Sequence, residues 1–195
     1  DLSWCDLQTA ADRTALAQRL IVQSASDRGV LSKFYLQHQY RQVFLPLLWD
    51  ETELKSGLRR GGVYLILGGS GAVGSLISRF LIEQYDAHVI WLGRRRIDHP
   101  RLQETLKSFQ CKPLYIQADA TDPDSLRSAL EEVKQRHAII HGAIYSALPD
   151  RAVGSLFETS ESEFLQSLQV KTLGSLNFYQ ALQNQALDFL CYFSC

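Results

Sequence analysis

A glycine-rich turn between a strand and a helix is the feature that most limits how this chain can fold. The turn reads Gly69-x-Gly71-x-x-Gly74, follows the apolar run VYLIL at residues 63–67 and precedes a helical pattern over residues 73–85. In such a unit Gly69 would make the tight turn, Gly71 would admit a pyrophosphate and Gly74 would let the helix pack closely on the strand. The helix N-terminus then faces the anion. The pattern predicts a dinucleotide site, and a glycine-rich turn without a ligand is the alternative.

Strands and helices alternate along the rest of the chain. Apolar runs predict four further strands, at residues 88–92, 113–117, 138–144 and 189–193. Asp122 before Pro123 marks one helix start, and Ser160 with Glu163 forms a capping box that opens one long helix through Leu176. Alternation of this kind implies parallel pairing with right-handed crossovers. We therefore expect an α/β fold with a doubly wound, Rossmann-like parallel sheet.

The first part of the chain has a different, helix-rich pattern, so we expect a division into residues 1–60 and 61–195. Thr9 and Asp12 have capping-box spacing. The helix that follows would carry an apolar face made by Leu16, Leu20 and Ile21. Residues 40–44 alternate enough to predict a short strand.

Composition excludes several classes of protein. Twenty Lys and Arg against 21 Asp and Glu give a net charge of -1, which offers no general attraction to nucleic acid or to a membrane surface. No apolar run is long enough to cross a bilayer. The opening DLSWCDLQ has neither the basic start nor the apolar stretch of a signal peptide, so we do not expect export. The four cysteines show no CxxC spacing, which favours a reducing, cytoplasmic setting. The chain contains no methionine, so we expect it to be a piece of a longer polypeptide.

The residues after the second strand indicate which dinucleotide binds. A protein that binds NAD has a carboxylate there for the ribose 2′-hydroxyl, about 20 residues after the last glycine. This chain has Arg94, Arg95 and Arg96 instead. A guanidinium group binds a phosphate with two hydrogen bonds but cannot accept one from a hydroxyl. NADPH is therefore predicted over NADH, and a solvated basic loop is the alternative.

Five segments in this order resemble one family: GGVYLILGGSGAVG, VIWLGRRR, YIQADATD, IIHGAIYSAL and VKTLGSLNFYQAL. They resemble the ketoreductase domain of modular polyketide synthases, in the short-chain dehydrogenase superfamily. The resemblance implies NADPH-dependent reduction of a β-ketoacyl thioester on an acyl carrier protein. It also implies that residues 1–60 are the C-terminal part of a structural subdomain. Residues 61–195 would then be the NADPH-binding part of the catalytic subdomain, with a sheet that is incomplete at its C-terminal end.

The resemblance also assigns cofactor contacts. They are Gly68, Gly69, Ser70, Gly71, Ala72, Val73, Gly74, Arg94, Arg95, Asp119, Ala120, Ser146 and Ala147. The glycine loop would contact the pyrophosphate, and Arg94 and Arg95 would contact the 2′-phosphate. Asp119 and Ala120 would contact the adenine. Ser146 and Ala147 would contact the nicotinamide ribose.

The implied chemistry moves a hydride from the nicotinamide to the keto carbon while a tyrosine protonates the oxygen. Lys171 matches the family's lysine, which lowers the pKa of that tyrosine; as a lone residue it would be a solvated helical lysine. Cys195 stands where the family has a serine that holds the carbonyl oxygen, and a thiol is a weak donor. The resemblance places the tyrosine beyond Cys195.

Two other positions depart from the family pattern, and a third bears on the configuration of the alcohol product. Leu67 replaces a threonine before the glycine loop, and Tyr145 replaces a histidine before Ser146. Asp150 falls near the loop that sets the alcohol configuration, but an aspartate beside proline is also an ordinary turn residue. No configuration is predicted.

Three functions remain open from the sequence. The first is an active ketoreductase whose partners are the carrier protein with its phosphopantetheine-linked β-ketoacyl chain, the rest of the ketoreductase and neighbouring synthase domains. The second is a degenerate, non-catalytic ketoreductase that serves as a scaffold, and the third is an NADP-responsive binding module. Because the last predicted strand would lie at an apolar sheet edge, we expect the isolated chain to need more polypeptide for stability.

Overall fold

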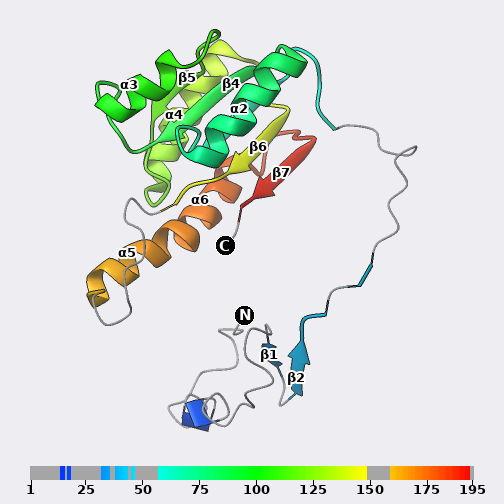
Figure 1. Cartoon of the computed structure of the whole chain (residues 1–195), viewed down its shortest axis with the longest axis vertical. Coiled ribbons are helices and arrows are strands. Elements are labelled where there is room, and N and C mark those ends of the chain that lie inside the picture. Colours follow the sequence, from blue (N-terminus) through cyan, green and yellow to red (C-terminus); the bar gives the residue numbers. More distant parts are fainter. Residues whose placement is uncertain are drawn as a thin grey trace. The chain divides into compact units, whose positions relative to one another are not determined.

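The computed structural model describes residues 57–148 and 159–193, and in the first part 14–15, 17–18, 32–35, 38–43 and 45–46 (Figure 1). The chain divides into two compact units, Asp1–Leu54 and Lys55–Cys195. The boundary between them lies a few residues before the division expected from composition.

The first unit contains a β-hairpin. β1 (Ser32–Tyr35) pairs antiparallel with β2 (His38–Arg41). The strand predicted at residues 40–44 shares only residues 40 and 41 with β2, so the predicted bounds were wrong. Strand β1 was not predicted. Four residues, Thr14, Ala15, Ala17 and Gln18, are helical. The predicted capping box and apolar helix face lie outside the described residues.

The second unit is built on a parallel five-stranded sheet. Its strands are β3 (Val63–Leu67), β4 (His88–Gly93), β5 (Leu114–Gln117), β6 (Gly142–Tyr145) and β7 (Phe189–Tyr192). They lie in the order β5-β4-β3-β6-β7, and each neighbouring pair is parallel. The predicted doubly wound α/β sheet is therefore confirmed.

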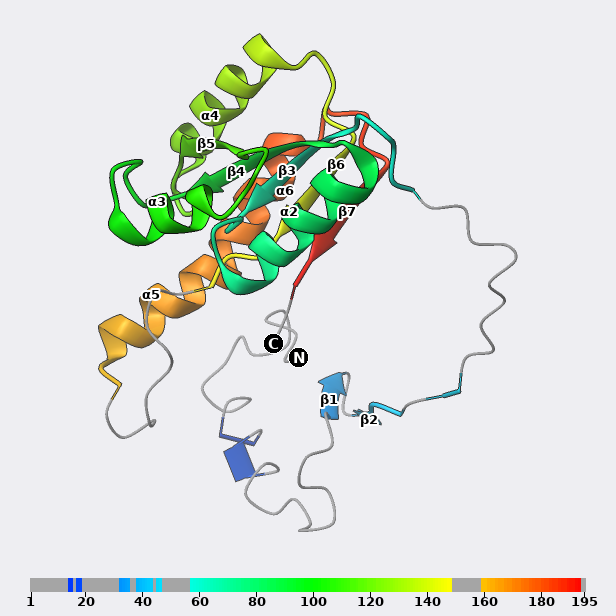
Figure 2. The ribbon, with the colours of Figure 1, turned by 45° about the horizontal axis from the view of Figure 1, so that its top comes forward.

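Helices cover both faces of this sheet (Figure 2). They are α2 (Ala72–Tyr85), α3 (Pro100–Lys107), α4 (Pro123–Arg136), α5 (Glu161–Lys171) and α6 (Leu173–Leu182). Side chains alternate along β3: Leu65 packs in one buried cluster with residues of α4 and α6, whereas Ile66 packs in another with residues of α2 and α3. The all-apolar run of β3 is thus explained by burial on both faces.

Two of the predicted helix starts are confirmed. The Asp122 side chain accepts a 2.9 Å hydrogen bond from the Asp124 amide, and Ser160 and Glu163 form both bonds of the capping box. Helix α3 was not predicted, although Pro100 in its first turn and the buried pair Leu102 and Leu106 are signals for it.

Strand β6 and the helix after it differ from their predictions. β6 begins at Gly142 instead of residue 138, and Ile139 is 58% exposed. The single long helix expected from Ser160 is divided at Thr172 into α5 and α6. The Tyr145 hydroxyl donates to the carbonyl of Val170, which is the acceptor that the Gly174 amide would use in an unbroken helix. A contact from β6 therefore accompanies the break.

The last strand, β7, lies at one edge of the sheet in the described part of the chain. Its last two residues, Cys191 and Tyr192, are exposed. Cys111 and Cys191 are free thiols, and the reducing compartment expected from the cysteines stays a prediction. None of the described helices is long and apolar enough to span a membrane.

Candidate cofactor site

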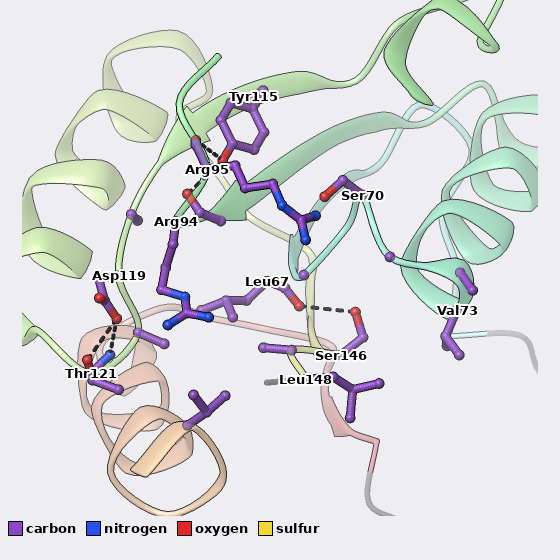
Figure 3. A pocket seen from close by; sticks show the side chains of 18 residues that line it. Leu67, Ser70, Val73, Arg94, Arg95, Tyr115, Asp119, Thr121, Ser146 and Leu148 are labelled. Atoms are coloured by element: carbon purple, nitrogen blue, oxygen red, sulfur yellow. Dashed lines mark hydrogen bonds between the residues drawn. The ribbon is translucent and has the colours of Figure 1, made fainter. Parts of the chain in front are cut away.

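A cleft of about 230 Å³ opens at the carboxyl ends of the central strands (Figure 3). It lies where the chain, having extended the sheet from β3 towards β5, returns to pair β6 on the other side of β3. Ligands of doubly wound folds bind at such a switch point. All predicted cofactor contacts line this cleft except Gly69 and Gly74. Those that line it are Gly68, Ser70, Gly71, Ala72, Val73, Arg94, Arg95, Asp119, Ala120, Ser146 and Ala147.

The two glycines that do not line the cleft support the turn from behind. A Cβ on Gly69 would lie 2.0 Å from Cδ1 of Trp91, and a Cβ on Gly74 would lie 2.6 Å from the carbonyl oxygen of Gly68. Gly74 thus permits the close helix packing that the sequence predicts. The left-handed residue of the turn is Gly68, with φ of 85°. Gly69, which the glycine spacing predicts to make the tight turn, does not have a positive φ.

The cleft side of the turn is open. A Cβ on Gly71 would meet only the Gly68 carbonyl oxygen, at 3.2 Å. Gly71 is also the N-cap of α2, which has no side-chain cap and no acidic residue in its first turn. Amide groups at a helix N-terminus favour an anion, and no carboxylate opposes one in this first turn. The turn therefore fits a phosphate group.

Buried side chains of β4 and α2 fix the helix behind the turn. The Trp91 indole donates a 2.7 Å hydrogen bond to Ser78 Oγ, which donates at 2.6 Å to the Gly74 carbonyl. Trp91 and Ser78 are both fully buried. Neither residue was predicted from the sequence to support the site.

Arg94 and Arg95 extend into the cleft from the end of β4. Figure 3 shows Arg95 directed towards Ser70 of the glycine turn. It shows Arg94 directed between Leu67 and Asp119, which lies in the loop after β5. Two guanidinium groups therefore lie on the cleft opposite the open side of the turn.

Side chains of β5 bind the backbone that carries these arginines. The Tyr115 hydroxyl donates to the carbonyls of Gly93 and Arg95, and Gln117 Nε2 donates to that of Arg94. Burial raises the pKa of Tyr115 to about 12, and the charge of Arg95 partly opposes that shift. The hydroxyl is therefore neutral at physiological pH. Sequence reasoning missed Tyr115, whose only signal is its place in the strand next to β4.

The loop after β5 forms one side of the cleft. The Asp119 carboxylate accepts hydrogen bonds from the amide and hydroxyl of Thr121, at 2.9 and 2.8 Å. Asn177, which is buried on α6, donates at 3.0 Å to the Ala120 carbonyl. The loop is thus fixed from within and from α6, and the one carboxylate among the cleft-lining residues is hydrogen-bonded to its own loop.

The segment after β6 closes the cleft next to β3. The Ser146 hydroxyl donates at 3.0 Å to the carbonyl of Leu67, which also accepts the Ser146 amide at 2.9 Å. Leu67, which stands where a threonine was expected, therefore contributes its backbone to this junction. Tyr145, the residue that replaces a histidine, is buried against Phe178 and Tyr192.

Lys171 lies at the end of α5, beside the cleft but not on its lining. Its neighbour Val170 lines the cleft, whereas Lys171 Nζ donates at 3.1 Å to the Phe193 carbonyl. That carbonyl follows β7, on the segment that leads to Cys195. Cys195 and Asp150 lie outside the described residues, so the predicted role of each stays a prediction.

Comparison with known proteins places this fold and cleft in a family. The KR domain family matches residues 62–195. The chain is 38% identical to the polyketide synthase ThaG of Burkholderia thailandensis, over 72% of this chain and 2% of that protein. It is 36% identical to the polyketide synthase PksM of Bacillus subtilis, over 70% of this chain and 3% of that protein. The chain thus spans a small part of these relatives.

Solved structures show the same fold. A crystal structure of a ketoreductase domain from the bacillaene assembly line has a TM-score of 0.65 and 23% identity, covering 94% of this chain and 42% of that one. A multidomain structure from a keto acid-selecting NRPS module, which includes a ketoreductase, has a TM-score of 0.66 and 22% identity, covering 96% and 16%. The family match, the relatives and the fold agree: the chain belongs to the ketoreductase (KR) domains of polyketide synthases, in the short-chain dehydrogenase superfamily.

Proposed function

We propose that this chain supplies the NADPH-binding part of a ketoreductase in a polyketide synthase. The reaction is the reduction of a β-ketoacyl thioester on an acyl carrier protein to the β-hydroxyacyl form. The observation that carries the proposal is the pair Arg94 and Arg95 on the cleft that also holds the open glycine turn. The carrier protein, the neighbouring synthase domains and a cytoplasmic setting belong to the same proposal, and membership of the KR family supports them.

The residues present fit an NADP dinucleotide. The turn at Gly71 and the N-terminus of α2 would hold the pyrophosphate. Arg94 and Arg95 would hold the 2′-phosphate, which NADH lacks. The end of β4 offers no carboxylate for a ribose 2′-hydroxyl, and Asp119 is hydrogen-bonded to Thr121. When bound, the cofactor supplies the hydride that reduces the keto carbon.

We propose that Lys171 is the charged residue of this chain that acts where the substrate carbonyl is reduced. Its ammonium group donates to the carbonyl of Phe193, which follows β7 and precedes Cys195 by two positions in the sequence. A cation at this position would stabilise the deprotonated form of the tyrosine that the family resemblance places beyond Cys195. The substrate oxygen would receive its proton from that tyrosine, and Lys171 would keep the pKa of the donor low enough for transfer.

A non-catalytic scaffold within the synthase is the second candidate. Cys195 favours it, because a thiol donates a weaker hydrogen bond to a carbonyl oxygen than the serine hydroxyl of the family does. The scaffold would still bind NADPH if its cleft keeps the turn and the arginines, so binding alone does not separate the two candidates. Turnover does.

The separating experiment measures oxidation of NADPH by the full-length protein in the presence of a β-ketoacyl thioester. A ketoreductase consumes NADPH and forms the β-hydroxyacyl product, and Lys171→Met lowers kcat by about a hundredfold or more, the range of a lost acid–base contribution. Lys134→Met, on the exposed side of α4, is the matched control and leaves kcat unchanged. Binding of NADPH without product in the unaltered protein would favour the scaffold.

A further inference from the structure

Tyr115 connects the arginine pair to the sheet. Its hydroxyl lies 2.7 Å from the carbonyl oxygen of Gly93 and 2.5 Å from that of Arg95, so its single proton is shared between acceptors on either side of Arg94. The Gly93 carbonyl also accepts the Ala118 amide at 2.9 Å. The Gly93 carbonyl therefore keeps a hydrogen bond without the Tyr115 hydroxyl, and the bond by which this hydroxyl holds the arginine backbone is the one to the Arg95 carbonyl.

Two neighbouring residues, Gly93 and Gln117, support this contact. A Cβ on Gly93 would lie 3.2 Å from the Tyr115 hydroxyl oxygen, closer than a side chain there tolerates without some displacement. Gln117 lies on the same face of β5 as Tyr115, and it donates at 3.1 Å to the Arg94 carbonyl. Three successive carbonyls, Gly93 to Arg95, thus accept hydrogen bonds from two side chains of the neighbouring strand.

We propose that Tyr115 is a positioning residue that sets cofactor selectivity, acting through the backbone of Arg95. The inference rests on the proposed function, in which Arg94 and Arg95 bind the 2′-phosphate that distinguishes NADPH from NADH. Removal of the hydroxyl keeps the ring but releases the Arg95 carbonyl. The arginines must then be ordered when the phosphate binds, and that entropy cost falls on ligands with a 2′-phosphate.

The test compares Tyr115→Phe with the unaltered full-length protein. Each is titrated with adenosine 2′,5′-bisphosphate and with adenosine 5′-monophosphate, which differ only in the group that the arginines bind. We expect Tyr115→Phe to bind the bisphosphate about fivefold more weakly, the size of one lost hydrogen bond, and the monophosphate as tightly as the unaltered protein does. Tyr179→Phe, an exposed tyrosine on α6, is the matched control and leaves both affinities unchanged.

Two outcomes for Tyr115→Phe overturn the inference: an unchanged affinity for the bisphosphate, or an equal loss of affinity for both probes.

Gln117→Leu is the second variant. It removes the hydrogen bond to the Arg94 carbonyl, and its exposed side chain lies outside the cleft lining. It weakens bisphosphate binding about twofold in the same selective way. If Tyr115→Phe fails to fold, an unchanged preference in Gln117→Leu overturns the inference. Unaltered protein that does not distinguish the probes overturns the proposed cofactor, and this inference with it.

Discussion

Trp91 lies directly behind Gly69 of the glycine turn, so that a Cβ on residue 69 would come within 2.0 Å of the indole Cδ1. Trp91 is fully buried and stacks edge-on against Phe109, with ring centroids 5.3 Å apart. The ring therefore has little room to move away from the turn. The position of the glycine turn depends on this contact between Trp91 of β4 and Gly69.

Gly69→Ala is expected to destabilise the protein. The added methyl group overpacks a buried contact, so the free energy of unfolding should fall by about 1–3 kcal/mol, and NADPH binding should weaken as the turn moves. Urea unfolding and a cofactor titration measure the two effects. Gly57→Ala is the control, because no atom lies within 4 Å of a Cβ there. Equal stability of the two variants would contradict the contact.

Ser78→Ala is expected to leave the Trp91 indole N–H without a partner inside the protein. Its 2.7 Å bond to Ser78 Oγ is buried, so the loss should lower the free energy of unfolding by about 1–3 kcal/mol. Ser75→Ala makes the same change on the same helix, where the hydroxyl donates to the Ala72 carbonyl at the surface, and should cost about 0.5 kcal/mol or less. Thermal or urea unfolding of both variants checks the difference.

Tyr145 should make stability fall in alkali. Burial, followed by the nearby Tyr192 and Asp119, raises its pKa to about 12 from an ordinary 10.0, although Arg94 opposes the shift. The unfolded chain therefore loses the proton first as pH rises. The stabilisation is complete below pH 10 and is lost between pH 10 and about 12. Urea unfolding across this range should show the unaltered protein losing stability relative to Tyr145→Phe. A constant difference would show that Tyr145 does not contribute.

The sequence was sufficient to predict the parallel sheet. Buried parallel strands appear as short apolar runs, and Asp122 and Ser160 mark helix starts by side-chain chemistry that acts over three residues or fewer. The glycine spacing and Arg94 are likewise local patterns, and the structure brings them to one cleft. Their binding of the cofactor stays a prediction.

What could not be predicted depends on contacts between distant residues. The break at Thr172 accompanies a hydrogen bond from Tyr145 to Val170, which are 25 positions apart. The left-handed residue of the turn is Gly68, whereas Gly69 lies against Trp91, which is 22 positions further along the chain. The contact of Tyr115 with the arginine loop likewise depends on the pairing of β4 with β5. No local pattern reports such pairings.

The most direct test of the cofactor assignment is a titration of the full-length protein with NADPH and NADH, with Arg94→Ala beside it. Arg101→Ala, on an exposed site of α3 outside the cleft lining, is the control and keeps the preference of the unaltered protein. We predict roughly ten- to a hundredfold tighter binding of NADPH by the unaltered protein, as charge-assisted hydrogen bonds to a phosphate provide, and loss of the preference in Arg94→Ala. Equal affinity of the unaltered protein for the two cofactors would contradict the account.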